Sequence, residues 1–441
     1  MVQKKVHILT YGCQMNVSDS ERIAASLRSC GYAETGSLDE ADMVILNTCS
    51  VRAKAEERIY GILHTMKGQL KKNPDLIIGV GGCVAQQEGK QLLERVPHLR
   101  FVFGTHNLHL LPQMINAAES GRRLSETDFI DDDKRFDLYP QSSDFSGVTR
   151  FITIMQGCDN YCSYCIVPYV RGREVSRRPE DILAEVRLAV EAGVKEVTLL
   201  GQNVNSYMVK NGDGSAFAEL LRAIAAVDGI TRLRFMTSHP KDISTPLIDC
   251  FADLDKLCSH IHLPVQAGSD RILQLMNRGY TRADYLEMIA RLRFVRPDIL
   301  VTSDIIVGFP GETEADFQQT LDLMEEVVYS DSYSFVYSPR PETKAALMPD
   351  STTKEEKHQR LDRLLKLQKK LTSGLQAELL GKRVEVLVEG TGKIPGQIYG
   401  RTSGNRVVNF TGDPSLAGSL QFPLIVRNNQ NSLLGRLDAI S

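Results

Sequence analysis

The chain has 441 residues, of which 42% are hydrophobic and 24% charged, and its formal net charge is −3. At roughly 150 residues per domain this length predicts about three domains, and the composition excludes collagen-like, low-complexity and wholly disordered chains. No apolar run approaches the roughly eighteen residues that span a bilayer, and the N-terminus has no signal-peptide core, so we expect a cytoplasmic protein that contacts no membrane. Nine cysteines are too few for a disulfide scaffold, so their positions matter more than their number.

Residues 1–120 alternate short apolar runs with helical patterns. A capping box of Ser18 and Glu21 predicts the start of the first helix. The predicted strands are residues 5–11, 43–47, 76–82 and 101–104. Strands that alternate with helices predict an α/β domain, with a doubly wound parallel sheet covered by helices on both faces.

Three cysteines lie where these strands end. Cys13, Cys49 and Cys83 each fall within about two residues of the carboxyl end of a predicted strand, which is the edge where open parallel sheets bind ligands. We therefore expect the three thiols to share a ligand site. The alternative is that they are three buried packing residues.

The central part of the chain begins with residues 121–145, whose acidic run, Ser and Gly predict a linker. Alternation of strands and helices resumes in residues 146–375 and predicts a partial (β/α) barrel, with its active site at the carboxyl ends of the strands. The six predicted strands of this barrel are residues 150–156, 195–200, 232–237, 260–265, 299–308 and 332–338.

The C-terminal part begins with one long helix, predicted over residues 354–379 from a leucine stripe opposite Lys and Arg. Beyond Gly381 the pattern changes to period two with Gly, Asn and Pro turns, so residues 376–441 are expected to form a small β-barrel of the OB type. Residues 354–441 carry 14 Lys+Arg against 8 Asp+Glu, a net charge of +6. This excess fits a phosphate-binding surface or a solvated helix face.

The most specific pattern of the chain is GCDNYCSYC at residues 157–165. Cys158, Cys162 and Cys165 form a Cys-x3-Cys-x2-Cys array on a loop that directly follows a predicted strand. Three thiolates so spaced can bind three irons of a 4Fe-4S cluster and leave the fourth iron open for a ligand. The alternative of a zinc site needs four ligands, and no fourth cysteine or histidine lies nearby.

This array resembles the motif of the radical S-adenosylmethionine (SAM) superfamily, including an aromatic residue, Tyr164, directly before the third cysteine. The resemblance implies a cluster whose open iron binds the methionine amine and carboxylate of SAM. One electron from that cluster would cleave SAM and give a 5'-deoxyadenosyl radical. No residue is then expected to act as a direct acid or base, since the chemistry belongs to the cluster and the cofactor.

Further segments resemble successive motifs of one family within that superfamily, the methylthiotransferases, and within it the branch that modifies N6-isopentenyladenosine in tRNA. The resemblance covers the whole chain in order. The segments besides the cysteine loop are TYGCQMN (10–16), NTCSVRAKAEE (47–57), GGCVAQ (81–86), LLGQNVNSY (199–207), HLPVQAGSD (262–270), DIIVGFPGET (304–313) and GRTSGNRVVNF (400–410).

The family resemblance implies that Cys13, Cys49 and Cys83 bind a second, auxiliary 4Fe-4S cluster. One SAM would methylate a sulfur held there and a second would supply the radical, so that two SAM molecules insert sulfur and methyl at C2 of the adenine next to the anticodon. The implied partners are tRNA carrying N6-isopentenyladenosine, an electron donor and a sulfur donor or cluster-repair protein. We expect a monomer.

The resemblance also implies cofactor contacts at the carboxyl ends of the barrel strands. In the superfamily a turn such as Gly201-Gln202-Asn203 holds the methionine amine, although any βα loop can contain such a turn. The expected SAM contacts are Tyr164, Gly201, Gln202, Asn203, Ser238, Gln266, Asp304 and Val307.

Two basic segments are candidates for tRNA binding. Four arginines follow the cysteine loop, and a guanidinium pairs well with tRNA phosphates or with the carboxylate of the cofactor, although a solvated loop is the alternative. The C-terminal strands resemble the TRAM domain, an RNA-binding module, where basic groups beside an aromatic residue suit a splayed RNA strand. The expected RNA contacts are Arg171, Arg173, Arg177, Arg178, Arg401, Asn405, Arg406 and Phe410.

Two alternatives stay open at this point. Sister branches of the family modify threonylcarbamoyladenosine in tRNA or an aspartate of a ribosomal protein, and a non-catalytic iron–sulfur RNA-binding protein would carry the same cysteines.

One departure from the family pattern affects a loop near the barrel rim: residues 338–346 have Glu342 and Lys344 where the family usually has Gly and Pro.

Overall fold

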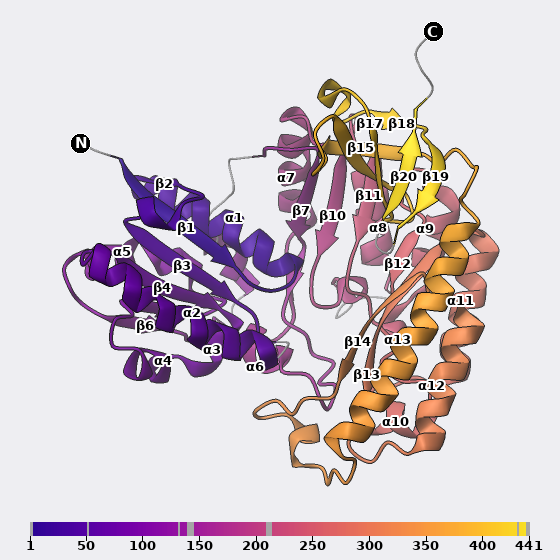
Figure 1. Ribbon diagram of the computed structural model, residues 1–441, viewed down its shortest axis with the longest axis horizontal. Helices are drawn as coiled ribbons and strands as arrows, with labels where there is room; N and C mark the ends of the chain where they lie inside the picture. The colour runs from indigo at the N-terminus through magenta and orange to yellow at the C-terminus, as the bar shows by residue number, and fades with distance from the viewer. Residues whose placement is uncertain are drawn as a thin grey trace.

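The computed structural model describes residues 3–50, 53–130, 133–138, 145–208, 214–429 and 432–437. Figure 1 shows three bodies in chain order: a sheet between helices (indigo and violet), an open barrel with helices outside (magenta to orange), and a small sheet (yellow) at one end of the barrel. The arrangement confirms the predicted fold class.

The N-terminal body is one sheet in the order β2-β1-β3-β4-β5-β6, with every neighbouring pair parallel. Its strands are β1 (Lys4–Thr10), β2 (Tyr32–Glu34), β3 (Met43–Thr48), β4 (Ile77–Gly82), β5 (Phe101–Phe103) and β6 (Leu124–Glu126). Its helices are α1 (Gln14–Ser29), α2 (Ala53–Lys72), α3 (Cys83–Glu88), α4 (Lys90–Arg95) and α5 (Leu111–Glu119).

Hydrophobic clusters cover both faces of this sheet. In β3, Val44 and Leu46 pack on one side with Leu63 of α2, whereas Met43 and Ile45 belong to the cluster on the other side. Side chains of a strand alternate between the two faces, so a strand buried on both sides appears in the sequence as a continuous apolar run. The doubly wound arrangement is therefore as predicted.

Two details of this body differ from the prediction. Helix α1 begins at Gln14 with Cys13 as its N-cap, so Ser18 and Glu21 do not form a capping box. Their side chains contact the barrel instead: Ser18 Oγ lies 3.1 Å from Thr153 Oγ1, and Glu21 pairs with Arg150 at 3.2 Å. Strand β6 lies inside the predicted linker and pairs with β5, so the sheet extends to Glu126.

The barrel consists of two parallel three-stranded sheets, β11-β10-β7 and β12-β13-β14, joined by a bridge between Leu233 and Leu257. Its strands are β7 (Thr149–Thr153), β10 (Glu196–Leu200), β11 (Arg232–Phe235), β12 (His260–His262), β13 (Leu300–Val307) and β14 (Asp331–Val336). Since β7 and β14 are the two ends of this order, the barrel is partial, as predicted.

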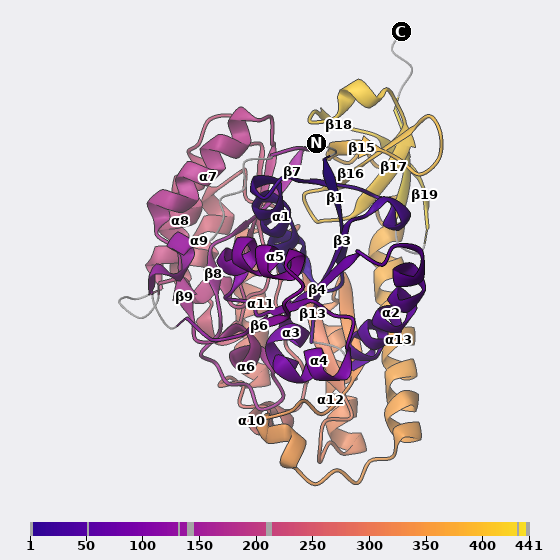
Figure 2. The ribbon, with the colours of Figure 1, turned by 90° about the vertical axis from the view of Figure 1, so that its left-hand side faces the viewer.

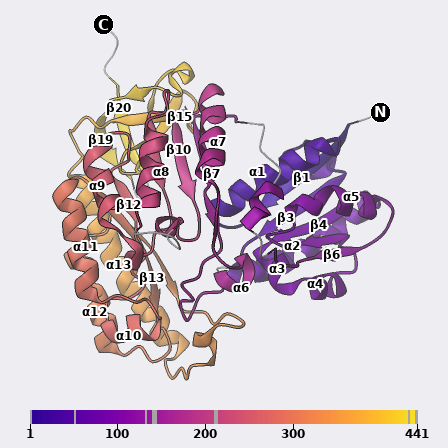
Figure 3. The same cartoon turned by 180° about the vertical axis from the view of Figure 1, so that it is seen from behind.

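Helices cover the outside of the barrel, as Figure 3 shows from behind. They are α7 (Pro179–Glu191), α8 (Ser215–Ala225), α9 (Thr245–Asp253), α10 (Asp270–Leu275), α11 (Arg282–Val295) and α12 (Glu314–Val327). The hydrophobic core lies between these helices and the strands. After β7 the chain forms the short strands β8 (Met155–Gln156) and β9 (Val175–Ser176), with the short helix α6 (Val167–Arg171) between them.

The C-terminal body follows α13 (Lys354–Ala377), which starts at a capping box of Thr353 and Glu356. Its curled sheet has the order β18-β15-β16-β17-β20-β19 around a core that includes Val388, Ile398 and Phe410. The strands are β15 (Val386–Thr391), β16 (Gln397–Thr402), β17 (Val407–Thr411), β18 (Leu420–Gln421), β19 (Leu424–Asn428) and β20 (Leu433–Arg436).

The small sheet closes one end of the barrel. Arg234 of β11 donates to the carbonyl of Ser403 at 3.1 Å, and the backbone of Gly404 lies close against Leu300, the first residue of β13. These contacts are at the amino ends of the barrel strands. In Figure 1 the arrows of β7 and β10 point away from the yellow sheet, toward α6. The carboxyl rim, where the site is expected, is therefore at the opposite end.

Candidate functional site

The loop of Cys158, Cys162 and Cys165 lies at the carboxyl rim, between β8 and α6, and the rest of the barrel holds it on two sides. The amide of Gly157 donates to Oε1 of Gln202, in the turn after β10, at 2.5 Å. On the other side the amide of Ser163 donates to the carbonyl of Met276 at 3.0 Å. Hydrogen bonds from two distant segments thus fix the loop in place before any ligand binds.

These thiols are buried in a way that suits metal ligands. Burial raises the pKa of Cys158 and of Cys165 to about 12, so both thiols are neutral in the metal-free protein. A bound metal removes such protons, because the thiolate is the ligand. Among the described residues no three His, Cys, Asp or Glu side chains converge as they would on a single ion. In a 4Fe-4S cluster each cysteine binds a different iron, so the three thiols of this loop fit three irons of one cluster.

Arg278 is a residue of this site that sequence reasoning missed. Its side chain is buried, and its Nη1 donates to Cys162 Sγ at 3.2 Å and to the hydroxyl of Tyr164 at 3.4 Å. Its Nη2 donates to the carbonyl of Pro264 at 2.7 Å. Arg278 follows α10 in the segment MNRGY, which matches no motif, so only the folded chain brings it to the cysteine loop.

The predicted SAM contacts at the strand ends include polar atoms that no protein group satisfies. Asn203 donates from Nδ2 to Asp242 at 2.6 Å, but its buried Oδ1 has no partner among the described residues, and neither has the buried Oγ of Ser238. Gln266 adopts a left-handed φ of 73° just beyond β12. Buried polar atoms normally have partners, so the orphaned atoms mark this rim as a place for a polar ligand.

Asp304 and Val307, both on β13, lie on opposite faces of that strand. Asp304 is half-buried and lies 3.6 Å from Nε2 of His262. Val307 is fully buried in the hydrophobic core between strands and helices. Because strand side chains alternate, the side chain of Val307 packs away from the barrel interior, so only the backbone of Val307 is left for the predicted contact with SAM, which stays a prediction.

Cys13, Cys49 and Cys83 come together at the carboxyl edge of the N-terminal sheet, as predicted. The thiol of Cys49 hydrogen-bonds Cys13 and, with the nearby charge of Arg171, lowers the pKa of Cys13 to about 6. Cys83 begins α3 and is buried. Burial raises its pKa, while the charge of Arg171 opposes that rise.

Helix α6 connects the two sets of cysteines. It begins two residues after Cys165, and both its N-cap Ile166 and its residue Val170 pack against Cys83. Its last residue, Arg171, pairs with Asp19 of α1 at 2.8 Å. Figure 2, viewed from the side of the N-terminal body, shows α6 next to α3. Both candidate cluster sites therefore lie at one interface between the two bodies.

The four arginines after the cysteine loop differ in exposure. Arg171 is 3% exposed and lies inside the domain interface, so its predicted contact with tRNA is wrong. Arg177 is largely buried and binds Glu185 at 2.6 Å, which also contradicts a tRNA contact. The side chains of Arg173 and Arg178 are 69% and 67% exposed, and their predicted roles stay predictions.

The predicted RNA contacts of the C-terminal body differ in exposure. Phe410 is fully buried in the core of the small sheet and offers no face for a base. Arg401 pairs with Glu389 at 3.1 Å, and Nη1 of Arg401 donates to Asn405 Oδ1 at 3.4 Å. Burial lowers the pKa of Arg406, whose charge lies near Asp331 of β14. Burial therefore contradicts the predicted RNA contact of Phe410, whereas those of the partly exposed Arg401, Asn405 and Arg406 stay predictions.

The rim loop that departs from the family pattern keeps a glycine-like turn. Glu342 adopts a φ of 64°, the left-handed region that favours glycine. Lys344 begins the short 3₁₀ helix Lys344–Leu347, where a proline also fits. The amide of Ala345 then donates to the carbonyl of Ser163 at 2.8 Å. The two substitutions therefore leave the loop docked on the cysteine loop.

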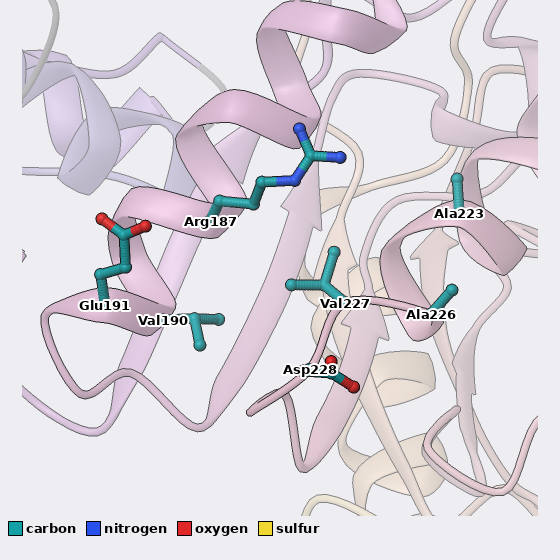
Figure 4. A pocket seen from close by; sticks show the side chains of 7 residues that line it. All are labelled: Arg187, Val190, Glu191, Ala223, Ala226, Val227 and Asp228. Carbon is teal, nitrogen blue, oxygen red and sulfur yellow. The ribbon is translucent and has the colours of Figure 1, made fainter.

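A surface hollow of about 400 Å³ lies elsewhere, between α7 and the end of α8 (Figure 4). Its lining consists of Arg187, Val190, Glu191, Ala223, Ala226, Val227 and Asp228. Helices of a βα unit end where the next strand begins, so this hollow is at the barrel end opposite the cysteines. It contains none of the predicted site residues.

Comparison with known proteins agrees with the geometry. Residues 5–104 match "Uncharacterized protein family UPF0004", residues 152–324 the radical SAM superfamily, and residues 377–419 the TRAM domain. The tRNA-2-methylthio-N(6)-dimethylallyladenosine synthase of Geobacter metallireducens is 61% identical over 99% of this chain and 98% of its own length. That of Geotalea uraniireducens is 60% identical over 99% of both.

The chain belongs to the tRNA-2-methylthio-N(6)-dimethylallyladenosine synthase family. It is therefore a radical SAM enzyme, whose family implies SAM and 4Fe-4S clusters as cofactors, as the motifs predicted. Two solved structures of a radical SAM methyltransferase, TsrM, from Kitasatospora setae share the fold, with TM-scores of 0.58 and 0.59 at 13% and 14% identity. The match to the first structure covers 79% of this chain and 74% of the TsrM chain, and the match to the second covers 78% and 75%. Within the described residues no helix is long and apolar enough to cross a membrane.

Proposed function

We propose that this protein inserts sulfur and methyl at C2 of N6-isopentenyladenosine in tRNA, next to the anticodon, by radical SAM chemistry. In this proposal Cys158, Cys162 and Cys165 hold the cluster that binds SAM. The auxiliary cluster is held by Cys13, Cys49 and Cys83. The placement of both cysteine sets at one interface carries the proposal, because sulfur held at one site must meet a substrate activated at the other.

Helix α6 is the observation that supports this arrangement most directly. Its N-cap Ile166, the residue next to Cys165, packs on Cys83, so the chain passes directly from the loop of one site to the wall of the other. A substrate base held between the two sites would lie within reach of both. Positioning of this kind is what a protein contributes when its cofactors supply the reactive groups.

The chain's own residues then have supporting roles. When bound, the clusters and SAM supply the electron, the methyl group, the sulfur and the radical that removes hydrogen from C2. Arg278 holds Cys162, and Gln202 holds the cysteine loop through the amide of Gly157. Asn203 Oδ1 is placed to accept a hydrogen bond from an ammonium, and Ser238 Oγ offers a second polar contact.

The finer points of partners and organisation belong to the same proposal. The exposed Arg173, two residues after α6, and the exposed Arg178, the N-cap of α7, bind tRNA phosphates together with the basic C-terminal body. The enzyme works as a cytoplasmic monomer. A separate electron donor and a sulfur donor serve the two clusters. We propose domain boundaries at residues 1–126, 146–375 and 376–441, with the sheet extended to β6 and a shorter linker than the sequence suggested.

Mass spectrometry of tRNA nucleosides tests the function. A strain that lacks this gene should accumulate N6-isopentenyladenosine and lose its 2-methylthio derivative, and the wild-type gene should restore the product. The same gene with Cys13, Cys49 and Cys83 changed to Ala should not. Restoration of threonylcarbamoyladenosine methylthiolation instead would move the enzyme to a sister branch.

A further inference from the structure

Arg171 occupies an unusual place, since it belongs to the radical core but lies inside the N-terminal body. It is the last residue of α6 and is 3% exposed. Its carbonyl lies 2.9 Å from Nε2 of His106, and its Nη2 lies 2.8 Å from Oδ2 of Asp19. Two residues of the N-terminal body thus fix both the backbone and the guanidinium.

One donor nitrogen of the guanidinium is buried without an acceptor. Its Nη1 has no hydrogen-bond partner among the described residues. A buried donor without an acceptor is strongly unfavourable, and such donors are rare in native proteins. Arg171 directly follows Val170, which packs against Cys83, and its partner Asp19 lies in α1, the helix whose N-cap is Cys13. The spare donor therefore lies at the auxiliary cysteine site.

We propose that Arg171 is an anion-binding residue of that site, where Nη1 donates to an anionic sulfur held between Cys13, Cys49 and Cys83. This inference rests on the auxiliary cluster of the proposed function. A guanidinium is permanently charged and presents donors in a fixed fork, which suits an anion, and Asp19 holds the fork in one orientation. The radical core thus completes a site whose cysteines all belong to the other body.

The experiment isolates the auxiliary site in the full-length chain. Cys158, Cys162 and Cys165 are changed to Ala, so that reconstituted protein should hold about four irons at the remaining site. Methanethiolate serves as the probe. Its binding is followed by the change in the electron paramagnetic resonance spectrum of the reduced cluster, and the reduction potential is measured by redox titration.

We expect Arg171→Gln to weaken methanethiolate binding by about tenfold to a hundredfold, because a hydrogen bond to a charged group is lost. The reduction potential should become more negative, since positive charge and hydrogen bonds near the sulfurs stabilise the reduced cluster. Arg171→Lys keeps the charge and should restore much of the affinity.

Arg150→Gln is the matched control, because Arg150 also forms a buried ion pair across the same interface, with Glu21, but at β7 and not at the cysteines. It should leave the methanethiolate affinity and the reduction potential of the cluster unchanged.

Three outcomes would contradict the inference. Equal losses of methanethiolate affinity in Arg150→Gln and Arg171→Gln would overturn it and leave both arginines the role of docking the two domains. Unchanged affinity and potential in Arg171→Gln, with about four irons bound, would overturn the inference alone. Loss of all iron in the background protein would overturn the auxiliary cluster and the inference together.

Discussion

Each set of cysteines in this protein has a buried arginine beside it, Arg278 at the radical loop and Arg171 at the auxiliary site. A buried charge is strongly unfavourable unless opposite charge or hydrogen bonds compensate it. Asp19 compensates Arg171 in part, whereas Arg278, within the part of the chain that the structure describes, donates to neutral oxygen and sulfur acceptors. A cluster with three cysteine thiolates is anionic, so its binding supplies the missing compensation at both places.

The radical loop itself gives the simplest prediction. Wild-type protein reconstituted without oxygen should hold about eight irons, and changing Cys158, Cys162 and Cys165 together to Ala should remove about four of them and all 5'-deoxyadenosine formation. Iron analysis and chromatography of the SAM products measure both. Cys30→Ala, at a half-buried thiol after α1, is the control that should change neither. Full iron content in the triple variant would contradict the ligand assignment.

Arg278 gives a second prediction, on the potential of the radical cluster. In protein with Cys13, Cys49 and Cys83 changed to Ala, Arg278→Met should make the reduction potential more negative and slow SAM cleavage, because the N–H bond to Cys162 Sγ is lost. Redox titration measures the shift, and Arg278→Lys should recover part of it. Arg291→Gln changes an exposed arginine of α11 and serves as the control. A variant with full iron and an unshifted potential would limit Arg278 to packing.

At the scale of single residues, the sequence identified the cysteines but not the positions of Arg278 and Arg171 beside them. Cysteine spacing and strand ends are local features, so both sets could be found without a structure. Arg278 lies 116 residues from Cys162, and no periodicity predicts that the two meet. Arg171 was singled out, but as an exposed tRNA contact, because a cluster of arginines does not reveal which of them the fold buries.

Among the helices and strands, the short helix α6 matters most for the site, because it connects the two sets of cysteines. It spans five residues, and the N-terminal body caps it: Thr105 Oγ1 donates to the carbonyl of Val170 at 2.7 Å. Gly172 ends it with a φ of 74°, and a Cβ there would lie 3.0 Å from the ring of His106. A glycine is thus required both by the backbone conformation and by the closeness of the other body.

This close approach predicts a specific cost for Gly172→Ala. The φ of 74° and ψ of −166° of Gly172 lie in a region used essentially only by glycine, so the backbone conformation alone should destabilise the variant by about 1–3 kcal/mol, and displacement of His106 should add to that. Gly31→Ala is the matched control, since Gly31 has a φ of 86° but no neighbouring atom within 4 Å of the place where an alanine Cβ would lie. Chemical denaturation should show a larger decrease in the free energy of unfolding for Gly172→Ala, together with reduced methylthio product. Equal decreases would mean that the contact with His106 is unimportant.

The strands and long helices were predictable, whereas α6 and the edge strands were not. The apolar run 43–47 coincides with β3, because strands buried in a parallel sheet are continuous in hydrophobicity. The predicted strand 299–308 contains β13, whose residues alternate between buried and partly exposed. Helix α6 is too short for a period, and β6 has only partly exposed residues with no apolar run. Both elements are determined by contacts with distant parts of the chain.

On the scale of the whole molecule, the small C-terminal sheet has a structural role at the barrel end opposite the clusters. Arg232 of β11 pairs with Glu385 at 2.7 Å, and Arg234 donates to the carbonyl of Ser403. Both arginines are buried. Truncation before Gly381 would therefore leave two buried charges without these partners, and a decrease in tRNA binding by such a protein could not be separated from damage to the barrel.

Surface charges give a cleaner test of RNA binding. Lys382 and Lys393 are exposed on the C-terminal body, within the residues that match the TRAM domain. Changing both to Ala should weaken tRNA binding and reduce the slope of log affinity against log salt by roughly 0.7 to 0.9 for each phosphate that the protein no longer neutralises, because fewer counterions are released. Lys67 and Lys71 are exposed on α2 of the N-terminal body, toward the end of that helix away from Cys49, and changing both to Ala is the matched control.

Filter binding across a range of salt concentrations measures the tRNA affinity of both double variants, and the iron content of each should stay at the wild-type level. Equal effects of the two pairs would show general electrostatic attraction. No effect of the first pair would move tRNA binding to Arg173 and Arg178, in the segment between α6 and α7.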